Sequence, residues 1–519
     1  MASSEALSSS ALPCCLKILP LKELSEVIES SREGKKVVQC HGCFDLLHIG
    51  HIRHFTEAKS FGDILVVTVT PDCFVNKGPG RPAFKEYLRL EAISSLDCVD
   101  YVALNETQTA EEAISLIKPD IYCKGPEYKD SVPGNNDFIA VERSVVEAHS
   151  GRMAFTTDDM TFSSSKLINN YLPVFSPEIA DYLKKFKENH PVSSIIDIVD
   201  SFKDLKVLVI GDTIIDEYHY VKTMGKSMKE PIIASKLLGI EKHAGGVLAI
   251  ANHISAFSDQ VDLLTLLGDR QPQEGFIRNS LHENVTPHFF YKKNSPTIVK
   301  RRFVESELLQ KLFEVYEINE SLISGRREEK LNSWLTDNLE NYDVVIVADY
   351  GHGMMTPKII QTVCDNAPFL CVNAQGNAGN LGHNPISKYY KADCISIAQH
   401  ELVLEFRSQH LLPQEMVETI AERFDYKNIF LTRGKYGTMC YKRNDELVSV
   451  PAIAPKIVDR VGAGDAVLSL ISLAVKKGVP MPVAGFIGNA AGAEAVAVVG
   501  NKTSLQKIPF IKHIESLLK

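Results

Sequence analysis

Residues 40–54 read CHGCFDLLHIGHIRH, and they continue the β-branched run KVVQC at residues 36–40. The run predicts a buried strand that ends at a glycine turn, and the H-I-G-H tetrapeptide predicts the start of a helix. A helix N-terminus offers unpaired N–H groups and the positive end of the helix dipole, which favour phosphate binding. His48 and His51 can share one helix face, and Gly50 allows a ligand to approach the backbone closely. The stretch therefore predicts a strand–turn–helix unit that holds an anion.

The segments that follow alternate short β-branched runs with longer amphipathic stretches. This alternation is typical of a parallel sheet covered by helices, so the expected fold class is α/β. We expect a domain over residues 36–172, after an N-terminal extension at residues 1–35. Its expected strands are KVVQC (36–40), DILVVTVT (63–70), VDYVAL (99–104) and DIYCKG (120–125), and its helices start at Ile49, Lys85, Ala110 and Asp137.

A second α/β region follows, because a chain of 519 residues exceeds the size that one hydrophobic core supports. Residues 176–202 predict two helices broken at Pro191, and we expect a helical linker over residues 173–204. The run KVLVIGD at residue 206 then predicts the first strand of a domain over residues 205–519. No repeat of fixed period is present, which argues against a solenoid.

The bulk composition excludes several classes of function. A net charge of −9 argues against the basic surface of a nucleic-acid-binding protein, so we expect no nucleic-acid partner. No apolar run approaches the length that spans a bilayer, and the first residues lack the charged start and apolar core of a secretory signal. The Ser-rich and Ala-rich start has no Arg and carries Glu5, which argues against a transit peptide. We expect a cytoplasmic protein with no membrane partner.

The cysteines are expected to be reduced thiols, mostly buried as small apolar side chains. Cys40 and Cys43 form a C-x-x-C pair, which elsewhere indicates zinc or redox chemistry. No second pair lies at the spacing of a zinc finger, so we expect these two cysteines to bind no metal.

The run GCFDLLHIGH closely resembles the G-x-F-D-x-x-H-x-G-H signature of cytidylyltransferase-like nucleotidyltransferases. The resemblance implies a Rossmann-like domain and extends over roughly residues 36–172. Among members of this family, the spacing of the matched motifs is most similar to that in the adenylyltransferase half of the bacterial bifunctional enzymes that combine a heptose-phosphate kinase with an adenylyltransferase. It implies that His48, His51, Lys77 and Lys124 are catalytic, through charge on the phosphates. It also implies nucleotide or phosphate binding by Gly42, Phe44, Asp45, Gly50, Arg89, Ser163, Ser164 and Ser165.

The implied reaction needs no covalent intermediate. A substrate phosphate attacks the α-phosphorus of a nucleoside triphosphate in line, and pyrophosphate leaves. Taken alone, the two histidines could instead form a solvated face, or half of a metal site with Asp45 as a third ligand. Asp45 could also orient the nucleotide or Mg²⁺, or hold a turn.

Residues 459–467 read DRVGAGDAV and lead into an apolar helix. The turn at Gly462, Ala463 and Gly464 can point several N–H groups at one spot, which makes an anion hole at a helix start. Asp465 could accept the proton of a sugar hydroxyl, or could only cap the helix.

The whole run resembles the D-x-x-G-A-G-D signature of ribokinase-type (PfkB) carbohydrate kinases. The resemblance implies a ribokinase-like α/β domain with a small β lid at YHYVKTMGKSMKEPIIASKLL (218–238), often used for dimerisation, so a homodimer is possible. It also implies sugar binding by Asp212, Asp216, Gly245 and Gly246, and nucleotide binding by Asn489.

Three segments depart from the kinase pattern. Ala249 stands where the kinases carry an Asn. In place of the N-x-x-E element that the family uses for Mg²⁺ and phosphate, the segment SIAQHELVLEF offers only Gln399 and a displaced Glu401. The segment at 372–384 differs from the shorter, Asp-containing family version. The anion hole is intact, so kinase chemistry remains the favoured interpretation, whereas heptose as the substrate does not follow.

The expected function is therefore that of a bifunctional enzyme of nucleotide-sugar synthesis. It transfers a nucleotidyl group from an NTP, with ATP favoured, to a heptose-like sugar 1-phosphate, and it phosphorylates a sugar or sugar phosphate with ATP and Mg²⁺. In the bacterial heptose enzymes the kinase comes first, so the domain order here is reversed. The alternative is a CDP-alcohol- or ADP-alcohol-forming enzyme whose second domain acts on an unrelated alcohol or is a pseudokinase scaffold.

Overall fold

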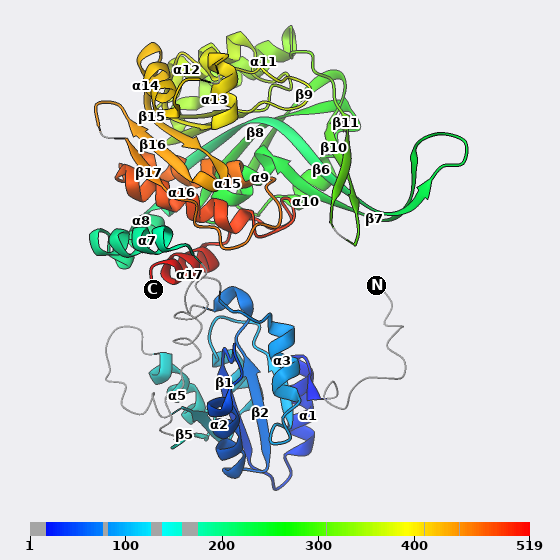
Figure 1. The fold of residues 1–519 in the computed structure, drawn as a ribbon, viewed down its shortest axis with the longest axis vertical. Helices are drawn as coiled ribbons and strands as arrows, with labels where there is room; N and C mark the ends of the chain where they lie inside the picture. Colours follow the sequence, from blue (N-terminus) through cyan, green and yellow to red (C-terminus); the bar gives the residue numbers. More distant parts are fainter. Residues whose placement is uncertain are drawn as a thin grey trace. The chain divides into compact units, whose positions relative to one another are not determined.

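The computed structural model describes residues 17–75, 81–125, 138–157, 175–307, 309–408, 410–445 and 447–519. The chain divides into two compact units: Met1–Val174 with Glu515–Lys519, and Phe175–Ile514 (Figure 1). No helix in the described ranges has both the length and the apolar character needed to cross a bilayer.

The first unit contains a five-stranded parallel sheet in the order β3-β2-β1-β4-β5. The β-branched runs form its central strands, and all six residues of β2 are buried. This order, with helices between successive strands, is that of a Rossmann-like domain. The elements are α1 (Leu21–Ser31), β1 (Val37–Gly42), α2 (Ile49–Ser60), β2 (Ile64–Val69), α3 (Glu86–Ser94), β3 (Tyr101–Leu104), α4 (Glu111–Ile117), β4 (Ile121–Lys124), α5 (Phe138–Ala148) and β5 (Arg152–Phe155).

Helix α1 lies within the segment that the sequence suggested as an extension. Its buried face carries Leu21, Leu24 and Ile28, which share one apolar cluster with residues of β1, β2, β3 and α4. Burying such a stripe is what stabilises a short amphipathic helix. Residues 21–31 are therefore packed on the sheet of the first unit.

The second unit is built on a 12-stranded sheet in which β6 (Lys206–Lys226) has two roles. Its first half pairs in parallel with β8 and β12 in the central sheet, and its second half pairs with β7 and β10 outside that sheet. The β lid predicted at residues 218–238 is thus present, and β10 and β11 complete it. The remaining strands are β7 (Ile233–Gly246), β8 (Gln260–Arg270), β9 (Val285–Pro296), β10 (Ile298–Glu305), β11 (Lys311–Glu317), β12 (Val344–Asp349), β13 (Leu370–Ala374), β14 (Lys391–Ala398), β15 (Asp425–Thr432), β16 (Thr438–Lys442) and β17 (Val448–Val450).

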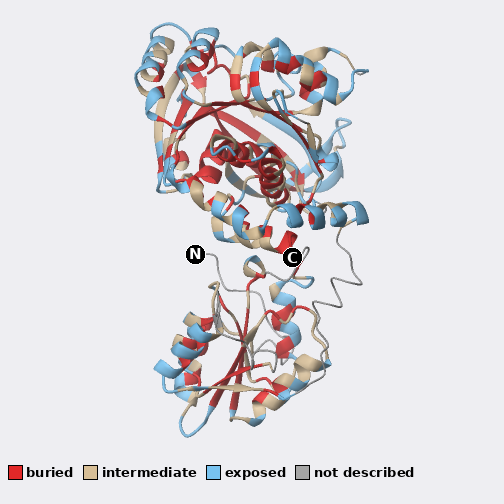
Figure 2. Cartoon of the chain, turned by 90° about the vertical axis from the view of Figure 1, so that its left-hand side faces the viewer, coloured by how far each residue is buried: buried red, intermediate tan, exposed pale blue. Residues whose placement is uncertain are grey.

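Helices cover the central sheet on both faces, as a ribokinase-like fold requires. On one face lie α9, α15 and α16, and α15 is buried without interruption from Ala466 to Ala474, as Figure 2 shows for the helices inside the curved sheet. The bounds are α9 (Val247–Ser255), α10 (Glu274–Ser280), α11 (Arg326–Asn338), α12 (Pro357–Asn366), α13 (Gln399–Phe406), α14 (Pro413–Arg423), α15 (Ala463–Lys476), α16 (Met481–Ala495) and α17 (Lys507–Leu517).

Two helices occupy the segment between the sheets, and they separate at Pro191 as the sequence predicts. They are α7 (Pro177–Asn189) and α8 (Val192–Asp200). Phe186 of α7 stacks on Phe486 of α16 with ring centroids 4.4 Å apart. The first of these helices is therefore packed on the second unit.

Candidate active sites

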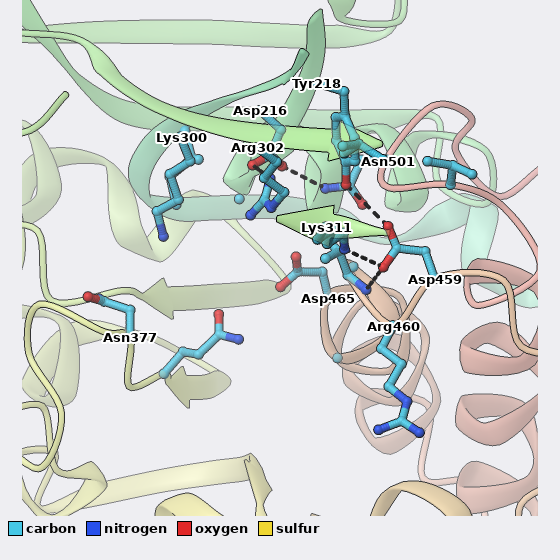
Figure 3. A pocket seen from close by; sticks show the side chains of 18 of the residues that line it. Asp216, Tyr218, Lys300, Arg302, Lys311, Asn377, Asp459, Arg460, Asp465 and Asn501 are labelled. Carbon is cyan, nitrogen blue, oxygen red and sulfur yellow. Dashed lines mark hydrogen bonds and ion pairs between the residues drawn. The ribbon is translucent and has the colours of Figure 1, made fainter. Parts of the chain in front are cut away.

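A pocket of about 630 Å³ opens between the lid strands and the N-terminus of α15. Charged side chains of both signs converge on it: Lys300 and Arg302 come from β10, Asp216 comes from β6, and Asp465 comes from α15 (Figure 3). The glycines predicted for the anion hole, Gly462 and Gly464, line the same pocket, as does Gly246. The structure thus brings together residues that are far apart in the chain, such as Asp216 and Asn501 at a separation of 285 positions.

The start of α15 has the geometry of an anion hole. Gly462 is the N-cap residue and has a φ of +83°, a conformation that disfavours residues with a Cβ. A Cβ at this position would also collide with the side chain of Asn501. Ala463 is the first helical residue, so the N–H groups of the first turn face the pocket end of the helix.

Asp465 lies in that first turn, and its Oδ1 accepts a hydrogen bond of 3.0 Å from the hydroxyl of Tyr350. Burial raises the pKa of Asp465 to about 7, with further contributions from the charges of Asp216 and Glu401, whereas Tyr350 and Lys300 oppose the shift. A carboxyl group with a pKa near neutrality is well matched to general-base catalysis.

Asp216 lies on the lid side of the same pocket. It forms a buried ion pair with Arg302, and its Oδ2 accepts a hydrogen bond of 3.4 Å from Nδ2 of Asn501. A Cβ at Gly245 would collide with this carboxylate, so the position opposite Asp216 requires glycine. Asp216 therefore lines the pocket, and its contact with a sugar stays a prediction.

A second network joins the lid to the loop before α15. Asp459 accepts hydrogen bonds of 2.7 Å from Nζ of Lys311 and 3.3 Å from the hydroxyl of Tyr218. Its oxygens also accept the backbone N–H groups of Val461 and Gly500. Asp459 therefore fixes the G-A-G-D turn against the lid.

Sequence reasoning did not select Lys300 or Arg302, although a signal was present. The two residues lie two positions apart on β10, so they project from the same face of the strand. Burial lowers the pKa of the Lys300 ammonium group, and the nearby Asp216 carboxylate opposes that shift. Asp459 is the first residue of the D-x-x-G-A-G-D signature, although sequence reasoning gave it no role of its own. Lys311, Tyr350 and Asn501 carried no comparable local signal.

Two predicted residues lie away from this pocket. Asp212 is buried and accepts the backbone N–H groups of His352 and Met354, each at 3.2 Å. Burial raises the pKa of Asp212 to about 6, and the charge of Asp349 adds to the shift. Asn489 donates hydrogen bonds to the carbonyl groups of Val450 and Pro451. The structure thus places both side chains in contact with backbone and outside the residues that line the pocket.

Glu401 is close enough to Asp465 to raise its pKa. The Glu401 oxygens accept the backbone N–H groups of Gly376 at 3.0 Å and Ala398 at 2.9 Å. The glutamate that the sequence presented as displaced therefore holds the end of β14 near the pocket.

In the first unit, α2 begins at the H-I-G-H tetrapeptide as predicted. His48 is the N-cap residue, and its Nδ1 accepts a hydrogen bond of 3.1 Å from the N–H of Gly50. The rings of His48 and His51 stack with centroids 4.0 Å apart, and Phe44 meets His51 edge-on at 5.4 Å. Partial burial lowers the pKa of His48, which favours its neutral form at pH 7.

The glycines of this motif are fitted to its rings. A Cβ at Gly42 would lie 3.0 Å from the ring of Phe44, and one at Gly50 would lie 3.0 Å from the ring of His48. The first turn of α2, with its two histidines, is therefore closely packed around the backbone that was predicted to hold phosphate.

The contacts of Asp45 and Arg89 in the structure are with neighbouring loops, and the ligand contacts that the resemblance implied stay predictions. Asp45 is buried, forms an ion pair with Arg81, and accepts the N–H groups of Ala83 and Phe84 at 2.9 Å each. The turn-holding alternative for Asp45 is thus the one that the geometry favours.

Arg89 is buried to within 1% of its surface. Its guanidinium group donates to the carbonyl groups of Cys43 at 2.6 Å, Thr70 at 2.8 Å and Phe84 at 3.0 Å, and to Oδ1 of Asp72 at 2.7 Å. These bonds use the guanidinium donors on three loops, so Arg89 fixes the backbone next to the first turn of α2.

Lys124 ends β4 and pairs with Glu142 at 2.9 Å in a largely buried environment. Its charge lowers the pKa values of His41 and His54, although burial is the larger cause in both. Lys77, Ser163, Ser164 and Ser165 lie outside the described residues.

The C-x-x-C pair does not form a joint site. Cys40 on β1 lies opposite Cys123 on β4, and ligand atoms of Cys40, Cys123 and His54 come within 4.8 Å of one another. Sγ of Cys43 lies instead 3.9 Å from the guanidinium group of Arg89. Among the described residues, any metal at Cys40 would therefore be shared with Cys123 and His54.

A family model described as pfkB family carbohydrate kinase matches residues 204–508, which is more than half of the chain. The chain belongs to the pfkB family of carbohydrate kinases. A second model, described as cytidylyltransferase-like, matches residues 40–170, so the kinase unit of this pfkB family member follows a region similar to cytidylyltransferases.

Curated relatives of this pfkB family member carry the name bifunctional protein HldE. The protein from Trichlorobacter lovleyi is 27% identical over 309 residues, which cover 58% of this chain and 61% of that protein. The protein from Desulfatibacillum aliphaticivorans is 39% identical over 158 residues, 30% of this chain and 31% of that protein. The chain thus spans about three fifths and about one third of these relatives. Phosphofructokinase-2 from Escherichia coli, solved in complex with potassium, superposes with a TM-score of 0.49 at 12% identity over 61% of this chain and all of that one.

Proposed function

We propose that the second unit phosphorylates a sugar or sugar phosphate with ATP. The observation that carries the proposal is the position of Asp465, whose carboxyl group has a pKa of about 7 and lies in the first turn of α15 beside the glycines of the anion hole. Lys300 and Arg302 add cationic charge to the same pocket. Such a pocket suits an anionic reaction in which a hydroxyl group must lose its proton.

In the proposed reaction, the acceptor hydroxyl attacks the γ-phosphorus of ATP in line. Asp465 accepts the hydroxyl proton, the bond from the γ-phosphorus to the bridging oxygen breaks, and ADP leaves. The N–H groups at the start of α15 and the ammonium group of Lys300 stabilise the charge that develops on the γ-phosphoryl oxygens. Asp216 binds acceptor hydroxyls on the lid side of the pocket.

Mg²⁺ is expected as the cofactor because it neutralises charge on the phosphates of ATP. It prefers carboxylate and other oxygen ligands. Glu401 fits this chemistry, since each of its oxygens accepts one backbone N–H and keeps a further lone pair. Asn377, whose side chain lines the pocket, offers a second oxygen.

The first unit is proposed to transfer a nucleotidyl group, with ATP favoured, to a heptose-like sugar 1-phosphate. A phosphate oxygen of the sugar attacks the α-phosphorus and pyrophosphate leaves. The helix start at His48 and His51 supplies N–H groups and ring donors for the phosphates. Lys77, Lys124 and the serines at 163–165 enter this proposal through the family resemblance.

The two reactions together would make a bifunctional cytoplasmic enzyme of nucleotide-sugar synthesis. We assign the transferase domain to residues 36–172, the helical linker to residues 173–204 and the kinase domain to residues 205–519. The partners are ATP or another NTP and a sugar phosphate, and not a nucleic acid or a membrane.

The lid is the proposed surface for a homodimer. Its strands β7 and β11 expose large apolar side chains, which in a soluble protein mark an association surface. Among them are Ile233, Leu237, Ile240, Phe313 and Val315. Sedimentation of the full chain and of a Leu237→Lys/Phe313→Lys variant tests this: we expect a dimer that the double substitution dissociates.

A second candidate function rests on Ala249, which replaces the Asn of the kinase pattern and does not line the pocket of Asp465. In this second candidate function, the first unit forms a CDP-alcohol or an ADP-alcohol. The second unit is then either a pseudokinase scaffold or a kinase for an unrelated alcohol. Incubating the whole protein with sugars, sugar phosphates, alcohol phosphates and each NTP, and identifying products by mass, separates these two candidate functions. A phosphorylated sugar and an NDP-sugar support the main proposal, whereas CDP-alcohol alone supports the second.

A further inference from the structure

A second pocket, of about 410 Å³, lies next to the kinase pocket and shares Asn501 with it. Its wall is formed by the end of β7, helix α9, the segment after α10 and the loop that precedes α17. The ionisable side chains that line it are Lys242, His243, His253, His282 and Lys502. No carboxylate is among the described residues that line this pocket, so its lining offers donors and cations.

His253, which is one of the residues that line the pocket, carries a buried donor that has no acceptor among the described residues. His253 is only 3% exposed, and its Nδ1 accepts a hydrogen bond of 3.0 Å from the N–H of Leu505. Burial lowers the pKa of His253 to about 4, so the ring is neutral at pH 7 and its proton lies on Nε2. Nε2 has no hydrogen-bond partner among the described residues. A buried N–H without an acceptor is costly, which favours a ligand that supplies one.

The other polar groups of the wall are held in fixed positions. Both ring nitrogens of His282 are bonded, to the hydroxyl groups of Ser255 at 2.8 Å and Ser504 at 3.1 Å. Asn252 donates to the carbonyl of Ser280 and accepts the N–H of His282. The wall around His253 is therefore preorganised, as a binding site for a small ligand requires.

The two lysines stand at the more exposed part of the pocket. Lys242 pairs with Glu217 at 3.0 Å, and Lys502 pairs with Glu241 at 3.0 Å. Their side chains are 41% and 53% exposed, so both ammonium groups can reorient towards an anion that carries more charge than one carboxylate. Both glutamates lie on the lid strands and outside the pocket lining.

We propose that this second pocket binds a phosphate group, with Nε2–H of His253 and the ammonium group of Lys502 as its donors. A phosphate monoester dianion offers several acceptor oxygens and the negative charge that the lining lacks. Two sources share this chemistry: the non-reacting phosphate of a sugar phosphate bound under the lid, reached past Asn501, or a free phosphate that acts as an effector. Only the first source rests on the proposed kinase function.

The direct test is calorimetric titration of the full-length protein with inorganic phosphate. Phosphate binding in the other anion sites is common to all variants, so the comparison between variants isolates this pocket. We expect Lys502→Met and His253→Gln to weaken one phosphate-binding event roughly tenfold or more, because each removes a hydrogen bond to a charged group. The exposed Lys358→Met is the matched control and should bind as the wild type does. Since His253 also holds the backbone at Leu505, Lys502→Met is the variant that separates binding from folding, because its side chain is 53% exposed.

Kinetics then identify the source. If the acceptor supplies the phosphate, Lys502→Met raises KM for a sugar phosphate by roughly tenfold and leaves KM for the unphosphorylated sugar unchanged. If the phosphate is a separate effector, added phosphate changes the wild-type rate but not that of Lys502→Met. Equal phosphate titrations for the wild type, Lys502→Met and His253→Gln would show that only ordered water meets the His253 donor, and would overturn the proposal. A protein without kinase activity that still shows the difference in titration would refute the kinase function alone.

Discussion

The hydroxyl group of Tyr350, at the end of β12, donates a hydrogen bond of 3.0 Å to Oδ1 of Asp465 in the first turn of α15. This bond lowers the pKa of Asp465, against the larger effect of burial, and the net result is a pKa of about 7. Two segments that are 115 positions apart thus set the protonation state of the proposed base.

The first prediction removes that base. Asp465→Asn keeps the size of the side chain but cannot accept the hydroxyl proton, so we expect phosphoryl transfer to fall by roughly 10²–10⁴-fold. ATP binding and nucleotidyl transfer by the first unit should remain unchanged, and they serve as internal controls. A variant as fast as the wild type would favour the scaffold interpretation.

The second prediction concerns pH. General-base catalysis needs the ionised carboxylate, so the kinase rate should rise with pH through about 7 and then level off. Tyr350→Phe removes the hydrogen bond that favours the ionised form, so the pKa should rise and the acidic limb should move to higher pH. At pH values above the acidic limbs of both pH–rate profiles, the wild type and Tyr350→Phe should approach the same rate. A purely structural role of Tyr350 would lower the rate at every pH without moving the limb.

Much of the first unit could be predicted from the sequence because its central strands are short, buried and rich in β-branched residues. The expected strands at 63–70 and 120–125 contain β2 and β4, and the helix expected at Ile49 begins there. Strand β5 escaped prediction because RMAF is a four-residue edge strand without a clear alternation.

The difference between Asp212 and Asp216 could not be predicted in the same way. Both residues lie on β6 at an even spacing, which places them on one face of a regular strand. Between them, however, β6 leaves the central sheet for the lid: Asp212 is in register with Leu266 of β8, and Asp216 with Lys300 of β10. Both carboxylates are buried, and this change of partner strand accompanies the difference between Asp216, which lines the pocket, and Asp212, which does not.

The third prediction tests the structural role of Arg89. Its replacement by Met removes the buried guanidinium donor from three carbonyl groups and from Oδ1 of Asp72, so the first unit should lose roughly 3–5 kcal/mol of stability. Lys85→Met is the matched control, because Lys85 pairs with the same Asp72 at 3.2 Å but is 64% exposed. That surface pair should contribute only about 0–1 kcal/mol. Denaturant unfolding of the first unit should show a much larger loss of stability in Arg89→Met than in Lys85→Met. Equal losses of stability in the two variants would contradict the prediction.

The fourth prediction concerns metal at the cysteines. We expect no stoichiometric zinc on the Cys40–Cys43 pair, because the Sγ of Cys43 lies 3.9 Å from the cationic group of Arg89. Elemental analysis of protein purified without chelator tests this. One zinc per chain that is lost in Cys43→Ser would contradict the prediction, whereas a metal retained in Cys43→Ser and lost in Cys123→Ser would belong to the group of Cys40, His54 and Cys123.

The last prediction separates the two tasks of the H-I-G-H tetrapeptide. Replacing His48 or His51 with Ala removes a donor aimed at the transition-state phosphates, an effect of roughly 3–4 kcal/mol that lowers nucleotidyl transfer by several orders of magnitude. His48→Ala also removes the acceptor that caps α2, since Nδ1 of His48 bonds the N–H of Gly50 at 3.1 Å. His48→Asn keeps a capping oxygen, because Asn is among the best N-cap residues, but it lacks the imidazole.

We therefore expect His48→Asn to unfold at the wild-type temperature and yet to transfer as poorly as His48→Ala. Kinase activity should stay near normal in all three variants, because the kinase pocket is lined entirely by residues of the second unit. A His48→Asn enzyme with wild-type transferase activity would show that the ring of His48 serves only to cap the helix, and the role of phosphate donor would then fall to His51 and the backbone of α2.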